Sequence, residues 1–103
     1  MSDESVILIN LLKVKPGKLD ALIALLQHNT DTVIRTLQGW KTTRLIAAGD
    51  GAGVVIYSEW ENAAAVEAMR SDPRMQACFP EVMELASLDS IMGSAVLSET
   101  RCG

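Results

Sequence analysis

The stretch Gly53–Glu61, GVVIYSEWE, decides the fold of this chain, and it predicts a β-strand. β-Branched and aromatic residues crowd it, and the glycine-rich segment 49–53, GDGAG, leads into it as a hairpin turn. Because side chains alternate across a strand, one face carries Val54, Ile56, Ser58 and Trp60, and the other carries Val55, Tyr57 and Glu59. Both faces begin apolar, so both need a cover. We expect the chain's own helices on one face and a second copy of the chain on the other.

Length and charge narrow the class of protein. The 103 residues fit one domain over 1–103, with a core of about 5–97 and a tail at 98–103. The net charge is −4, and the lysines and arginines do not cluster. Nucleic acids and anionic membranes both select a basic surface, so neither is an expected partner.

The cysteines and the N-terminal segment bear on the compartment. Cys78 and Cys102 show no metal-ligand spacing and are too few for a disulfide framework, so we expect reduced thiols in a cytoplasmic protein. Residues 1–4 are acidic, and the apolar run 6–12 is short and holds Asn10, so no signal peptide is expected. No run approaches the roughly 18 apolar residues of a membrane span.

Taken in order, the chain predicts strands over 5–14, 40–48, 53–61 and 90–99. Apolar residues at helical spacing predict one long amphipathic helix over 18–37, which Gly39 follows as a cap. A second helix is expected over 63–70 with Asn62 as its N-cap. A third begins at Pro73 after Asp72 and runs to about residue 79, where Pro80 bends or breaks it before another turn or two over 81–86.

The resulting order, β-α-β-β-α-β, predicts an α+β fold of the ferredoxin-like type. Its four-stranded antiparallel sheet would carry the helices on one face. The strands are apolar on both sides, and a patch of that size does not stay in water. We therefore predict a C2 homodimer in which two sheets pack face to face.

Two polar side chains, Asn10 and His28, bear on the possible chemistry. Asn10 interrupts the first strand on the face of Leu8 and Leu12, where its amide either ties down neighbouring backbone or points into a pocket. His28, the single histidine, faces away from the apolar stripe of its helix and is expected to be solvated. With no inward histidine, no nucleophile–base pair is visible, which disfavours hydrolase triads.

Four segments occur together: VKPGK at the end of the first strand, QGW after the long helix, YSEW at the end of the third strand, and SDPRM after the short helix. In this combination the chain resembles the antibiotic biosynthesis monooxygenase (ABM) family of small dimeric α/β-barrel proteins, over roughly residues 5–97. The resemblance implies a pocket between the sheet and the helices of each subunit. Members of the family include cofactor-free oxygenases that turn anthrones into quinones, haem-degrading oxygenases, and proteins without an assigned activity.

The site residues that the resemblance implies match only in part. In the anthrone oxygenases the third strand carries an Asn-Tyr-x-x-Trp pattern, which Tyr57 and Trp60 match, whereas Ile56 stands in place of the asparagine. A tyrosine and an arginine of that group would fall at Val66 and near Phe79. Of the haem degraders' residues only an asparagine matches, at Asn10. Their tryptophan would fall at Met69 and their axial histidine near Phe79, so we expect no haem, no other cofactor and no metal.

The favoured hypothesis is a cofactor-independent monooxygenase that oxidises an aromatic polyketide or quinol-type substrate with dioxygen. Hydrogen bonds to the substrate anion would come from the candidate catalytic residues Trp60, Asn10 and Tyr57. Tyr57 lies on the opposite strand face from Trp60, so the two share a pocket only if the strand twists or bulges. The expected substrate-binding residues are Ile56, Val66, Met69, Phe79 and Met92. Trp60 is equally well explained as a structural plug, and the alternative function is a non-catalytic dimeric module that binds a small aromatic ligand.

Overall fold

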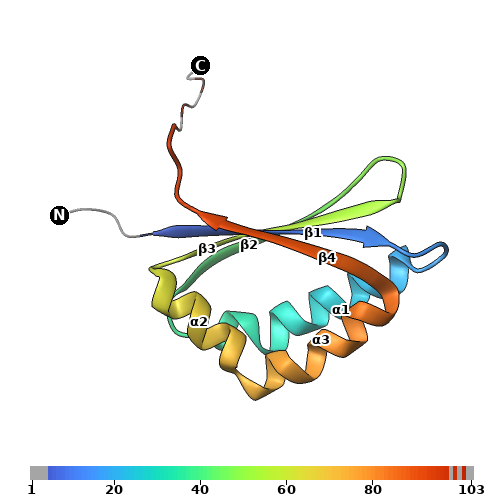
Figure 1. Ribbon diagram of the computed structural model, residues 1–103, viewed down its shortest axis with the longest axis horizontal. Coiled ribbons are helices and arrows are strands. Elements are labelled where there is room, and N and C mark those ends of the chain that lie inside the picture. Colours follow the sequence, from blue (N-terminus) through green and yellow to red (C-terminus); the bar gives the residue numbers. More distant parts are fainter. Residues whose placement is uncertain (1–4, 98, 100, 102–103) are drawn as a thin grey trace.

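The computed structural model describes residues 5–97, 99 and 101 (Figure 1). The expectations for residues 1–4, for Cys102 and for much of the tail lie outside this range. The strands are β1 (Val6–Val14), β2 (Trp40–Ala47), β3 (Gly53–Trp60) and β4 (Ala86–Gly93). The helices are α1 (Leu19–Thr32), α2 (Ala63–Ser71) and α3 (Pro73–Leu85), with a short 3-10 helix, η1 (Ile34–Thr36), after α1.

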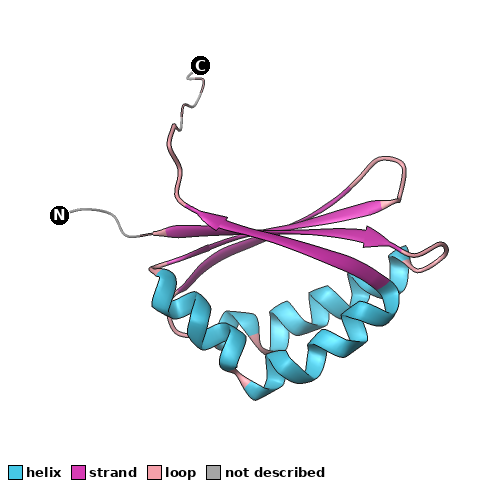
Figure 2. Cartoon of the chain, viewed as in Figure 1, coloured by secondary structure: helices cyan, strands magenta, loops and turns pink. Residues whose placement is uncertain are grey.

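The four strands form one sheet in the order β2-β3-β1-β4, and every neighbouring pair is antiparallel. All three helices lie against one face of this sheet, and the other face is bare (Figures 1 and 2). This arrangement is the ferredoxin-like α+β fold that the element order predicts. Among the described residues, no helix is long and apolar enough to cross a membrane.

Two buried clusters hold the helices to the sheet. The first joins Leu12 and Val54 on the central strands to Leu22 of α1 and Val82 of α3. The second joins the following residues of β1, η1, β3 and α2: Leu8, Ile34, Trp60, Val66 and Met69. Each fully buried aliphatic side chain contributes about 2 kcal/mol relative to an exposed one, so this face of the sheet carries most of the stabilisation. Between the two clusters the helices leave space, and that space becomes the pocket described below.

A β-bulge in β2 decides which side chains face the helices. Trp40 pairs with Trp60, but Thr42 pairs with Glu59, so Lys41 is the extra residue. One extra residue reverses the side-chain alternation beyond it. Thr43 and Leu45 therefore face the helices, opposite Ser58 and Ile56.

The long helix predicted over 18–37 is shorter in the structure. α1 ends at Thr32, and Val33 has φ −122° and ψ −62°, outside the helical range. Near this end the hydroxyls of Thr30 and Thr32 donate to the carbonyls four residues earlier, both at 2.8 Å, which loosens a helix. The apolar period continues beyond α1, because Val33, between the two helices, and Ile34 of η1 are both buried. The period therefore predicts burial correctly and the type of helix wrongly.

The prediction that the third helix ends at about residue 79 is also wrong, because the helix is not broken at Pro80. α3 continues through it from Pro73 to Leu85. An interior proline costs a helix about 3 kcal/mol. Packing on both sides of Pro80 offsets this cost, since Cys78 before it and Val82 after it both lie against the first core cluster. The predicted N-caps are confirmed: Asn62 accepts from Ala65 N at 2.9 Å, and Asp72 accepts from Arg74 N at 2.8 Å. The prediction that Gly39 caps the long helix is wrong, because α1 ends at Thr32 and Val33 is its C-cap.

The last strand lies earlier than predicted. β4 spans Ala86–Gly93 rather than 90–99. The segment 86–90, ASLDS, is too polar to predict a strand. An edge strand, however, is defined by backbone pairing alone, and β4 pairs with β1 from Val14↔Ala86 to Ile7↔Gly93. After Gly93 the described part of the tail leaves the sheet on the side away from the helices (Figure 1).

Candidate functional site

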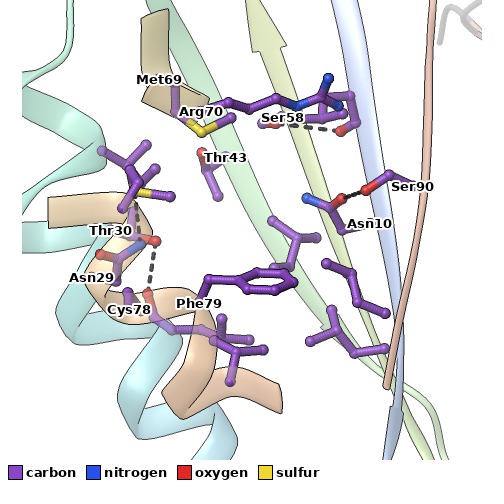
Figure 3. Close-up of a pocket in the computed structure, with 18 of the residues that line it drawn as sticks. Asn10, Asn29, Thr30, Thr43, Ser58, Met69, Arg70, Cys78, Phe79 and Ser90 are labelled. Atoms are coloured by element: carbon purple, nitrogen blue, oxygen red, sulfur yellow. Dashed lines mark hydrogen bonds between the residues drawn. The ribbon is translucent and has the colours of Figure 1, made fainter. Parts of the chain in front are cut away.

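A pocket of about 510 Å³ lies between the sheet and the helices. Every strand contributes to its lining, together with α1, η1, α2 and α3 (Figure 3). Its size falls in the usual range for sites that enclose a small organic ligand. The resemblance placed a pocket in this position, and the structure has one there.

Most of the pocket wall is apolar. Leu8, Leu12, Leu45 and Ile56 line it from the sheet. The helices supply the facing wall, with Leu26, Ile34, Met69, Met75, Phe79 and Val82. Phe79 is 51% exposed although its ring points into the pocket (Figure 3). A flat apolar ligand lying against that ring would bury it.

Asn10 supplies a directed hydrogen-bond donor within this apolar wall. Its Oδ1 accepts a hydrogen bond from Ser90 Oγ of the neighbouring strand β4. Asn10 and Ser90 are direct register partners, so both side chains stand on the helix-facing side of the sheet. The Asn10 amide nitrogen points toward the pocket interior (Figure 3), and among the described residues no partner takes its protons. Of the two predicted roles for Asn10, the structure favours the amide in a pocket.

Trp60 also lines the pocket, but its polar atom is occupied. The side chain is 1% exposed, and Nε1 donates to Ser58 Oγ at 3.1 Å. Ser58 Oγ in turn donates to the Leu8 carbonyl at 3.3 Å. The indole N–H therefore faces the protein rather than a ligand. Trp60 can act as a wall and as the structural plug that the sequence also allowed.

Five of the eight predicted site residues line this pocket: Asn10, Ile56, Trp60, Met69 and Phe79. Tyr57, Val66 and Met92 do not. Tyr57 stands on the bare face, because β1 and β3 pair without a bulge, and its hydroxyl donates to Glu59 Oε2 at 2.7 Å. Val66 is fully buried in the second core cluster. Met92 lies near the end of β4, opposite Leu8 and beyond Ser90.

Several polar lining residues were missed from the sequence. The sequence predicts Ser90 as the first residue of the last strand and gives it no role at the site. Thr43 faces the pocket because of the bulge in β2, and the sequence gives no clear signal for that bulge. Arg70 lines the pocket from the last turn of α2. Asn29 and Thr30 line it from α1, where Asn29 Nδ2 lies 3.4 Å from Met75 Sδ.

The lining offers no group suited to remove a proton. Among the described lining residues there is no histidine, aspartate or glutamate. The thiol of Cys78 also lines the pocket, but its pKa lies above the usual 9.0, mainly because it is buried and also because Glu81 is negatively charged. Cys78 therefore stays protonated at neutral pH. His28 is exposed on α1, as predicted. Within the described residues no three His, Cys, Asp or Glu side chains gather in a way that would hold a metal ion.

Comparison with known proteins identifies the family. The model of the antibiotic biosynthesis monooxygenase (ABM) family matches residues 5–81. The chain therefore belongs to the ABM family, as the four sequence segments indicated.

One characterised relative is the tetracenomycin-F1 monooxygenase of Streptomyces glaucescens, which is 35% identical over 72 residues. That alignment covers 70% of this chain and 64% of the relative, so the chain matches less than two thirds of the length of this enzyme.

Solved structures share the fold. The cofactor-independent oxygenase SnoaB of Streptomyces nogalater, solved as a variant, superposes with a TM-score of 0.84 at 14% identity, over 92% of this chain and 96% of SnoaB. Rv0793 of Mycobacterium tuberculosis superposes with a TM-score of 0.79 at 24% identity, over 94% and 99% of the two chains. At these identities the likeness concerns the fold alone.

Proposed function

We propose that this protein is a cofactor-independent monooxygenase that oxidises a flat aromatic substrate of the polyketide or quinol type. The observation that carries the proposal is the Asn10 amide, a free donor held by Ser90 in a largely apolar pocket. The family membership and the relative named as a monooxygenase support it.

The chemistry requires a substrate that activates dioxygen by itself. An anthrone or quinol becomes electron-rich when it loses a proton, and its oxygen then carries the negative charge. A preorganised N–H donor in a largely apolar pocket stabilises such an oxyanion better than water does. In this proposal the Asn10 amide donates to that oxygen, and Ser90 keeps the amide facing the pocket.

The oxidation then needs only substrate and dioxygen. The anion transfers one electron to dioxygen, and the two radicals combine to form a carbon–oxygen bond. Protonation gives a hydroperoxide. Its oxygen–oxygen bond breaks as the carbon loses its remaining proton, which releases water and leaves a carbonyl group. For an anthrone, the CH2 carbon and one O2 molecule become C=O and H2O, so atoms and electrons balance without a further reductant.

The first proton must leave to water, since the described lining holds no base. Ser90 is exposed on the edge strand β4, so the polar end of the pocket reaches solvent. The remaining candidate residues act as walls in this proposal: Ile56, Trp60, Met69 and Phe79 hold the rings of the substrate. Tyr57, Val66 and Met92 have no part in it.

A homodimer is part of the proposal. The bare face of the sheet carries Ile9, Leu11, Ile46 and Ile91, whose exposed fractions are 36%, 45%, 52% and 71%. They are contiguous, because Ile9 pairs with both Tyr57 and Ile91, while Val55 pairs with both Leu11 and Ile46. Isologous packing of this face against a second copy would remove the patch from water.

Oxygen uptake tests the function. Metal-stripped protein is mixed with dithranol, a 1,8-dihydroxyanthrone, beside a protein-free control. The proposal predicts faster oxygen consumption that tracks protein concentration, together with formation of the matching anthraquinone. Ligand binding by fluorescence quenching without any acceleration would instead favour a module that holds an aromatic ligand without catalysis.

A further inference from the structure

Arg70 is the charged group of the pocket. Among the described residues that line it, no other side chain carries a charge at neutral pH. The chain as a whole is acidic, with a net charge of −4. A single cation in an apolar site of an acidic protein marks the position at which a ligand's negative charge would be accommodated.

The position of Arg70 is fixed by its neighbours in α2. Met69, the preceding residue, is buried in the second core cluster at 7% exposure. Ser71 follows as the last residue of the helix, so Arg70 lies in the final turn, where the helix dipole also favours a cation. From there its side chain extends along the edge of the pocket (Figure 3). Gln76 of α3 lines the same region, with its amide nitrogen 3.5 Å from the Arg70 carbonyl oxygen.

The guanidinium of Arg70 keeps most of its hydrogen-bonding capacity. Among the described residues its side chain pairs only with Glu67, whose Oε2 lies 3.4 Å from Nη1, and the two side chains are 45% and 66% exposed. An exposed ion pair at this distance within one helix contributes little to stability. The fork of N–H groups is therefore available to a carboxylate, which it matches in a bidentate way.

We propose that Arg70 selects substrates that carry a carboxylate, so that the natural substrate is an aromatic acid. This inference rests on the proposed function for the ring system, and it assigns different tasks to two of the polar residues of the pocket. Asn10 donates to the oxygen on the reacting ring, whereas Arg70 pairs with a substituent at the pocket edge. Arg70 is thus a specificity-determining residue and takes no part in the oxidation.

A binding experiment with unreactive ligands tests this independently of turnover. The two probes are 1,8-dihydroxyanthraquinone and its 3-carboxylate, which share one ring system and differ in the charged group. Dissociation constants come from quenching of tryptophan fluorescence at low ionic strength, for the wild type, Arg70→Gln and the matched control Arg74→Gln. Arg74 is a suitable control because it is paired with Asp72 at 3.0 Å and does not line the pocket.

The wild type is expected to bind the carboxylate roughly tenfold more tightly than the neutral quinone, as charge-assisted hydrogen bonds of an arginine allow. Arg70→Gln should abolish this ratio, Arg70→Lys should restore part of it, and Arg74→Gln should keep it. A wild-type ratio near one, or a ratio that survives Arg70→Gln, overturns the inference. A clear ratio in a protein that never accelerates oxygen uptake contradicts the proposed oxygenase activity and leaves the carboxylate selectivity standing. Failure of both quinones to bind contradicts both.

Discussion

Ser90 Oγ on β4 donates a hydrogen bond to Asn10 Oδ1 on β1, and this contact orients the one free amide donor of the pocket's sheet wall. Without it, the Asn10 amide could rotate and present its oxygen to the ligand, which would repel an anion. The two residues are 80 positions apart in the chain and meet through strand pairing alone. Substrate activation in this account depends on their pairing.

Replacement of Asn10 by alanine should reduce oxygen uptake with dithranol about 100-fold, the usual effect of removing one preorganised oxyanion donor. Asn10→Asp should be no better, because a carboxylate beside the substrate oxygen opposes its ionisation. The control is Gln38→Ala, which removes an exposed amide in the loop before β2. Uptake by Asn10→Ala within a factor of two or three of the wild type would show that Asn10 is not the donor.

Ser90→Ala provides a graded version of the same test. It leaves the Asn10 amide in place and removes the hydroxyl that orients it. We expect a loss of about tenfold, smaller than that of Asn10→Ala, since the donor remains but is less well ordered. The double variant should be no slower than Asn10→Ala, because Ser90 acts through Asn10. If the activation free-energy costs of the two single variants added up in the double variant, Ser90 would act independently of Asn10, contrary to this prediction.

Trp60→Phe should affect stability more than chemistry. The change removes the 3.1 Å hydrogen bond to Ser58 and part of a fully buried ring. Urea unfolding should show a loss of about 2 kcal/mol, typical of a reduced core side chain. Turnover per folded molecule should fall by less than in Asn10→Ala. A large loss of turnover with unchanged stability would assign Trp60 a direct role at the substrate.

The pH dependence of turnover should follow the substrate rather than the protein. The described lining holds no group with an ordinary pKa between 5 and 9, and burial raises the pKa of Cys78 above its usual 9.0. The rate should therefore rise with pH as the bound anthrone ionises, without a bell shape. Cys78→Ser should leave the shape of the profile intact. An inflection near pH 6.5 would indicate a histidine base and contradict the account.

The raised pKa of Cys78 also has a consequence for stability. Because the folded-state pKa exceeds the unfolded value, the protonated thiol stabilises the fold below about pH 9, and this contribution is lost as the pH rises further.

Ile9→Asp should dissociate the proposed dimer. Ile9 lies on β1 in the middle of the bare face, between Tyr57 and Ile91. A buried, unpaired carboxylate there would oppose packing of the two sheets. Sedimentation should show a dimer for the wild type and for Ala24→Glu, which changes an exposed position on α1. A monomeric wild type at micromolar concentration would refute the dimer.

Helices and strands could be predicted where the local preference of the residues agrees with their burial in the fold. β3 carries the strongest strand signal and extends over Gly53–Trp60, within one residue of the prediction. Asn62 and Asp72 form their caps through hydrogen bonds to residues two or three positions away, so sequence alone identifies them. The errors occurred where tertiary contacts override local preference, as at Pro80, or where only backbone pairing defines the strand, as in β4.

The pocket was less predictable because it depends on register. Face alternation placed Ile56 and Trp60 correctly, and it also argued against Tyr57, which the resemblance favoured. Thr43 reaches the pocket through the β2 bulge, and Ser90 through an edge strand that was placed four residues too late. Neither the bulge in β2 nor the earlier start of β4 is indicated clearly by the amino-acid sequence.

The role of Asn10 and Ser90 in stabilising the substrate anion can be measured through the pKa of a bound substrate. Dithranol is titrated spectrophotometrically under argon, free and bound to the protein, so that ionisation is observed without oxidation. We expect a pKa about two units lower in the complex, equivalent to about 2.7 kcal/mol of anion stabilisation and in line with the roughly 100-fold loss expected for Asn10→Ala, and a return to the free value in Asn10→Ala. A pKa in the complex equal to or above that of free dithranol would contradict the claim that Asn10 and Ser90 stabilise the substrate anion.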